Sequence, residues 1–174
     1  PLAFLVAAGW LYWEGDRSAD LVAHTLEVKS AAADAMTQML DAETGQRGFL
    51  ITGDPAYLAP YDRGRDAIDD AIGRLAALVA DDAEQTRRVE RFRAEAAQQY
   101  EQQAVTVALA RAGLSEAAAA RVRAGLSKAL MDAMRVDVAE ILAAENALLG
   151  KRRASAARLR LLGLAQILLG ALAL

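Results

Sequence analysis

An unbroken alternation of three- and four-residue steps between mostly apolar positions constrains this chain most. The clearest run lies between residues 55 and 80, and a second run covers residues 18–51. This spacing keeps one helix face toward its neighbours, as in a bundle or coiled coil. In the run between residues 55 and 80, Arg65 is the polar exception. The positions of this run are Leu58, Tyr61, Arg65, Ile68, Ile72, Leu75 and Val79.

Composition agrees with a helical fold. The 174 residues are 55% hydrophobic, much of it alanine, and include only three prolines. Alanine and leucine favour helix, and strand-forming signals are weak. The sequence therefore predicts one all-α domain, an elongated antiparallel four-helix bundle, with helices at 18–51, 55–80, 83–112 and from 116 onward. Because no proline interrupts residues 116–174, we expect the last helix to be continuous.

The corner between the first two helices carries strong local signals. Gly53 suits a left-handed helix end, Asp54 suits an N-cap, and Pro55 suits the first helical position. Gly45 and Gly48 lie inside the preceding helix, where glycine costs about 1 kcal/mol relative to alanine. We therefore expect a neighbouring helix to approach the backbone there.

Two further helix boundaries are predicted downstream. Asp82 and Gln85 have the spacing of a capping box, with Asp in place of Ser or Thr. Gly113 is expected to end the third helix, and Ser115 to cap the fourth.

Both ends of the chain are apolar. Residues 1–13 end in Trp10, Tyr12 and Trp13, next to charged residues, a pattern typical of a membrane interface. We interpret 1–13 as the outer end of a first transmembrane helix, 14–153 as the helical domain that follows it, and 154–174 as the start of a second transmembrane helix. A core helix or a signal-peptide segment is the alternative for 1–13.

Several classes of function lack the necessary residues. The chain has no cysteine, one histidine (His24) and a net charge of −3. We therefore expect no catalytic residues, no cofactor, no metal site and no nucleic-acid partner. An acidic run on the second helix fits a solvated face better than a Ca²⁺ site. The glutamines of the third helix fit either a polar pocket or an exposed face. These residues are Asp62, Asp66, Asp69 and Asp70, and Gln98, Gln99, Gln102 and Gln103.

Residues 41–61, DAETGQRGFLITGDPAYLAPY, resemble the signature of the third type of CHASE sensory domain. The resemblance continues at Asp81-Asp82, Leu130-Met131-Asp132 and Leu148-Leu149, and it covers roughly residues 20–153. Phe49 stands where a tyrosine is expected. The resemblance implies that residues 14–153 form an extracytoplasmic helical sensory domain. Its motif residues are candidates for a signal or ligand site. These residues are Glu43, Thr44, Gln46, Arg47, Gly48 and Tyr61, with Met131, Asp132 and Arg135 as a late motif.

Glu43 and Arg47 leave two interpretations open. Their spacing of four residues favours a helical ion pair. The pair either recognises a charged ligand or holds the corner between the helices.

The resemblance also implies a receptor in the bacterial inner membrane, with the sensory domain periplasmic or extracellular. It would act as a homodimer and control a cytoplasmic output domain, either the histidine kinase of a two-component system or a nucleotide cyclase. The alternative functions are a structural dimerisation spacer and a membrane-associated helical tether without a ligand. The sequence identifies no ligand.

Overall fold

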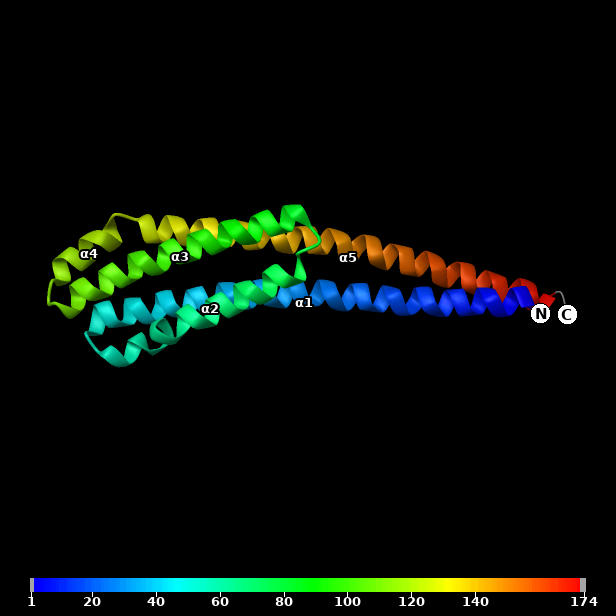
Figure 1. The fold of residues 1–174 in the computed structure, drawn as a ribbon, viewed down its shortest axis with the longest axis horizontal. Coiled ribbons are helices and arrows are strands. Elements are labelled where there is room, and N and C mark those ends of the chain that lie inside the picture. Colours follow the sequence, from blue (N-terminus) through cyan, green and yellow to red (C-terminus); the bar gives the residue numbers. More distant parts are fainter. Residues whose placement is uncertain (1, 173–174) are drawn as a thin grey trace. The chain divides into compact units, whose positions relative to one another are not determined.

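The computed structural model describes residues 2–172, and every regular element in that range is a helix. The prediction of an all-α chain is therefore confirmed for the described residues. In chain order the elements are α1 (Leu2–Thr52), the 3-10 helix η1 (Pro55–Leu58), α2 (Ala59–Leu78), α3 (Ala83–Arg111), α4 (Ser115–Arg123) and α5 (Leu126–Leu172) (Figure 1).

The chain divides into two compact units. The central unit is Val28–Leu142, and the terminal unit combines Pro1–Glu27 with Ala143–Leu174. Four helical segments share the core of the central unit: the second half of α1, then α2, α3 and the first part of α5. The three-four pattern of α2 faces this core as predicted, with Arg65 exposed. The largest fully buried apolar side chains of this core include Met39, Ile68, Ile72, Leu75, Phe92, Met131, Met134 and Ile141.

The corner after α1 has the predicted caps but a different helix. Gly53 has φ +71°, and the Asp54 carboxylate accepts a hydrogen bond from the Ala56 amide at 2.9 Å. Pro55 begins a 3-10 turn rather than an α-helix, and α2 starts only at Ala59. Pro60 explains the difference, since its ring would meet the Ala56 carbonyl inside an α-helix that began at Pro55. Starting at Ala59 places Pro60 in the first turn.

Gly45 and Gly48 allow η1 to lie directly against α1. A Cβ atom built on Gly45 would lie 2.6 Å from the Tyr57 carbonyl oxygen, and one on Gly48 would lie 2.9 Å from Cγ of the Tyr57 ring. Real Cβ atoms do not approach other atoms so closely. The two glycines are therefore required by the packing of Tyr57, as the sequence predicted for an approaching helix.

Two expectations for the C-terminal half are wrong. Gly113 ends α3 with φ +76°, but Ser115 is the first residue of α4, and the N-cap is Leu114, without a side-chain cap. The last helix is also not continuous, because Gly125 adopts φ +79° and separates α4 from α5. Proline is not needed for such a break, since glycine takes up a left-handed backbone at little cost.

The break shifts the buried face of α5. The apolar spacing of the sequence after residue 116 predicts a packing face that includes Val122, Leu126, Val136 and Ile141. Val122, Leu126 and Val136 are exposed by 46%, 43% and 57%, whereas Ile141 is buried as predicted. The helix starts again at Leu126 with a phase that depends on the turn before it, so the face could not be continued from α4. The buried apolar side chains in this part of α5 are Leu130, Met131, Met134 and Val138.

The interpretation of the α3 glutamines as an exposed face is wrong for two of them. Gln99 and Gln103 are fully buried, whereas Gln98 is exposed. Both side-chain amide atoms of Gln103 lack a hydrogen-bond partner among the described residues. The Gln103 backbone carbonyl accepts a long hydrogen bond, 3.5 Å, from the Gln46 side chain. The core therefore contains polar groups whose hydrogen bonds are incomplete.

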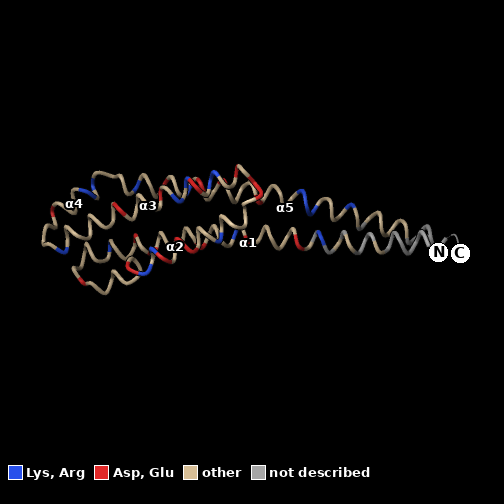
Figure 2. The backbone as a smooth tube through the Cα atoms, viewed as in Figure 1, with Lys and Arg blue, Asp and Glu red and all other residues tan. Residues whose placement is uncertain are grey.

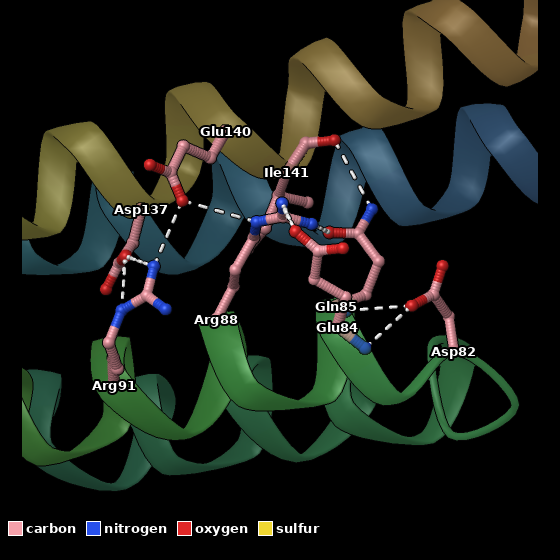
Figure 3. Close-up of polar contacts among 8 residues, drawn as sticks. All are labelled: Asp82, Glu84, Gln85, Arg88, Arg91, Asp137, Glu140 and Ile141. Carbon is pink, nitrogen blue, oxygen red and sulfur yellow. Dashed lines mark hydrogen bonds and ion pairs between the residues drawn. The ribbon is translucent and has the colours of Figure 1, made fainter.

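Arginines join α3 to α5 through a network of carboxylates (Figure 3). The Nε of Arg91 donates to the carboxylate of the buried Asp137 at 3.0 Å, and the Nη2 of Arg91 donates to the carboxylate of Glu140 at 3.0 Å. Arg88 contacts Glu140 at 3.2 Å. At one end of the network, the Asp82 carboxylate caps α3 by accepting hydrogen bonds from two backbone amides, as predicted. Its capping partner in that prediction, Gln85, donates its side-chain amide to the Ile141 carbonyl at 3.5 Å.

The terminal unit pairs α1 with α5. Nη1 of Arg152 donates to the Leu21 carbonyl at 2.8 Å and to the hydroxyl of the fully buried Thr25. Within the described residues, none of the helices combines the length and apolar character needed to cross a membrane. Most side chains of 1–13 and about half of those of 154–174 lie outside the described residues. The transmembrane assignments of 1–13 and 154–174, and the domain boundary between them, stay predictions.

Gly48→Ala should destabilise the chain, because the new methyl group would overlap the Tyr57 ring. We expect a loss of about 1–3 kcal/mol in the free energy of unfolding. Gly73→Ala is the matched control, since Gly73 is exposed in α2 with open space around it. There the better helix propensity of alanine should add about 0.5–1 kcal/mol. Urea unfolding followed by circular dichroism measures both. Equal stability of the two variants would contradict the close packing of Tyr57.

Glu95→Gln should stabilise the chain at neutral pH. The pKa of Glu95 is raised from 4.5, first by burial and then by the negative charge of Asp137. The unfolded chain loses this proton at a lower pH than the folded chain, so stability is lost as pH rises from 4.5 through the raised folded value. The Gln variant should therefore melt above the native chain at about pH 8, and both should melt together at about pH 3.5.

The control for this comparison is Glu101→Gln, which neutralises an exposed carboxylate on the same helix. For Glu101→Gln, the difference in melting temperature between about pH 3.5 and about pH 8 should be the same as for the native chain. If Glu95→Gln lowers the melting temperature at about pH 8, the carboxylate stabilises the fold and the assignment of its raised pKa is wrong.

Candidate functional site

The central unit contains a cavity of about 490 Å³ where α4 meets α5. Four elements contribute to its wall: α1, α3, α4 and α5, together with Gly125 between the last two. Its size falls within the range of small-molecule sites, about 300–1,000 Å³. The side chains facing it are Glu43, Gln46, Arg47, Leu50, Gln102, Thr106, Arg121, Val122, Arg123, Leu126, Ser127, Lys128, Met131, Asp132 and Arg135.

The cavity is basic although the whole chain is acidic. Five basic and two acidic side chains line it, in a chain with a net charge of −3. Elsewhere in the central unit, basic and acidic residues are interspersed along the helices (Figure 2). Leu50, Val122, Leu126 and Met131 supply an apolar part of the wall. The arrangement combines positive charge, hydrogen-bonding groups and apolar surface in one space.

Both carboxylates of the cavity are already neutralised by neighbours. Glu43 is buried and forms an ion pair with Arg47 at 2.6 Å. Asp132 binds Lys128 and also Arg135, the latter at 2.6 Å. The hydrogen bond from Lys128 is the largest cause that lowers the pKa of Asp132. The two acidic groups therefore do not cancel the positive charge of the remaining arginines.

Arg121 differs from the other basic residues of the cavity. Arg123 pairs with Glu116, but among the described residues Arg121 has no carboxylate partner. Its Nη2 donates to the side-chain oxygen of Gln102, and its Nε is buried without a partner. Buried polar groups nearly always find a hydrogen-bond partner, so an orphaned guanidinium nitrogen requires an explanation.

The structure brings two predicted motifs together. Glu43, Gln46 and Arg47 on α1 face the same cavity as Met131, Asp132 and Arg135 on α5. Their role as a signal or ligand site stays a prediction.

The other predicted site residues lie elsewhere. Thr44 is exposed, and Gly48 contacts Tyr57. Tyr61 packs its ring 5.9 Å from that of Tyr100 in the core, and burial is the largest cause that raises its pKa. Tyr61 is partly buried, whereas Tyr100 is buried, and the pKa of Tyr100 is raised to about 12 with burial again the largest cause.

Sequence reasoning missed five polar residues of the cavity, which are Thr106, Arg121, Arg123, Ser127 and Lys128. Four of them flank Gly125, and Thr106 becomes their neighbour only because the chain turns there. Gln102, which also lines the cavity, is one of the glutamines for which the sequence left a polar pocket open. The available signal was a glycine, Gly125, between an arginine-rich helical segment and one that contains a serine. Because no proline is present, the chain was expected to form one continuous helix, and the glycine was not recognised as a break.

The other candidate sites have less support from the structure. Among the described residues, no group of three or more histidine, cysteine, aspartate or glutamate side chains is placed to hold a metal ion. The aspartates of α2 are exposed on its outer face. His24 lies partly exposed in the terminal unit.

Comparisons with known proteins place the fold in a family. The profile of the CHASE3 domain matches residues 18–155. The sensor domain of the histidine kinase HK9 from Rhodopseudomonas palustris is similar in structure, with a TM-score of 0.65 and 28% sequence identity. The similarity covers 71% of this chain and 97% of that domain. The comparison with curated proteins finds no match. With most of its length matched by the family profile, this chain belongs to the CHASE3 domain family.

Proposed function

We propose that this chain is the sensory input module of a membrane-bound histidine kinase in a two-component system. Membership of the CHASE3 family and similarity to a histidine kinase sensor domain support the sensory role. In this proposal the domain is extracytoplasmic at the bacterial inner membrane and acts as a homodimer. An elongated four-helix bundle continues through its first and last helices into the membrane, and the catalytic activity belongs to a cytoplasmic output domain.

The observation that carries the proposal is the position of the cavity on two particular helices. α1 and α5 both line it, and both continue from the central unit into the terminal unit. A stimulus that changes the contacts of Arg47 or Arg135 therefore acts directly on the helices that leave the domain. A small shift of one helix relative to the other is then the transmitted signal.

The buried glutamines favour a core that has two alternative packings. A core of well-fitted apolar side chains favours one arrangement, whereas incompletely bonded amides favour rearrangements that give them partners. Gln99 bonds Ser127 on α5 at 2.6 Å through its amide nitrogen, while its oxygen has no partner among the described residues. Gln103 has none for either atom. A ligand shifts such an equilibrium only if it binds one arrangement better.

Gln103→Leu tests this account, because leucine removes both unpaired polar atoms while keeping similar volume. The free energy of unfolding should rise by about 1–3 kcal/mol. Gln98→Leu, on the exposed face of α3, should change it by less than about 0.5 kcal/mol. In the full-length receptor, Gln103→Leu should hold kinase autophosphorylation at one level under conditions in which the native receptor responds. A destabilised variant with a normal response would contradict the two-packing mechanism.

A structural dimerisation spacer is the second candidate, and the exposed apolar side chains Leu126 and Val136 on α5 favour it. Replacing residues 18–155 of the full-length receptor by an unrelated helical dimer separates the two. We expect autophosphorylation to persist but to become constant across growth conditions that change it in the native receptor. Regulation that survives the replacement would show that the domain only sets geometry.

A further inference from the structure

We infer that the cavity at Gly125 binds a small organic acid, with its carboxylate at Arg121 and its apolar body against Leu50, Val122 and Met131. The inference deepens the proposed function, on which it rests, by naming the chemical class of the stimulus. Three independent features of the cavity support it.

The first feature is the incomplete bonding of Arg121. A guanidinium has five N–H donors arranged to bind a carboxylate through two parallel hydrogen bonds. The partner of Arg121 at the cavity wall is the neutral oxygen of Gln102, and its buried Nε has none among the described residues. A carboxylate in the cavity would supply the negative charge that the guanidinium of Arg121 lacks.

The second feature is the start of α5. Leu126, Ser127 and Lys128 form its first turn and line the cavity. First-turn N–H groups have no acceptor within their own helix, and the helix dipole makes this end positive. Here the preceding residue is Gly125, which has no side chain to act as a cap, and no acidic residue lies in the described first turn. An anion is favoured at such a helix end.

The third feature distinguishes an organic acid from an inorganic anion. Leu50, Val122, Leu126 and Met131 give the cavity an apolar wall, and 490 Å³ is far more space than sulfate or phosphate fills. Burying apolar ligand surface favours binding roughly in proportion to the area removed from water. An inorganic ion would leave these side chains without contact. The wall therefore favours a carboxylate attached to a hydrocarbon body.

The test is binding to the whole chain, purified in a mild detergent. The probes are benzoate, hexanoate and succinate, with acetate, phosphate and sulfate as anions of little or no apolar body and benzyl alcohol as a neutral analogue. Thermal unfolding and titration calorimetry measure binding. We expect benzoate or hexanoate to bind saturably, at least about tenfold more tightly than acetate or phosphate. Benzyl alcohol should not bind, because it lacks the charge.

Arg121→Gln is the decisive variant, since glutamine keeps a donor for Gln102 but removes the charge. It should weaken organic-acid binding at least about tenfold. Arg135→Gln, at a more exposed position beside Asp132, should weaken it less. Arg74→Gln, on an exposed face of α2, should leave it unchanged. Circular dichroism of the free variants checks that each is folded, and the Arg135 variant keeps the test decisive if Arg121→Gln does not fold.

Three results would overturn the inference: none of the carboxylates binds at about 10 mM, phosphate or sulfate binds best, or neither Arg121→Gln nor Arg135→Gln weakens binding. The failure would differ from failure of the proposed function. If no organic acid binds but Gln103→Leu still fixes the output of the full-length receptor, the domain is a sensor for another stimulus. If organic acids bind and the output does not respond, the site exists without the signalling role.

Discussion

The left-handed backbone at Gly125 is the constraint on which the candidate site depends. It ends α4 and starts α5 at an angle that leaves space between them. The same turn brings Arg121 and the first turn of α5 to a cavity that α1 also lines. A residue with a Cβ adopts this conformation only at a cost, since the side chain collides with the following carbonyl. One glycine thus shapes the cavity and leaves the start of α5 without a side-chain cap.

Close packing at the other side of the cavity fixes α1. Gly45 and Gly48 let Tyr57 lie against the helix, which anchors the 3-10 turn beside Glu43 and Arg47. The ion pair and the steric need for two glycines are therefore separate contributions within one motif. The glycines hold the backbone in place, and the charged pair faces the cavity.

The core of the central unit is stabilised by different kinds of interaction along its length. Apolar side chains such as Phe92 and Met134 fill most of the central unit. Near the cavity, glutamines replace them, and several amide atoms have no partner among the described residues. Between α3 and α5, Arg91 and Asp137 add a charged contact away from the cavity. The core therefore combines a closely packed apolar part with a part whose polar groups are incompletely hydrogen-bonded.

The sequence by itself determined the all-helical character, the corner at Gly53, the cap at Asp82 and the face of α2. These depend on local propensity and on a periodic pattern, which neighbouring residues specify. Only the tertiary structure decided which glutamines are buried, which face of α5 is buried and that Arg121 meets Gln102. Alanine-rich helices present several faces of similar hydrophobicity, so the pattern does not select one. The turn at a single glycine sets the phase of the next helix, and that choice is made by packing against distant residues.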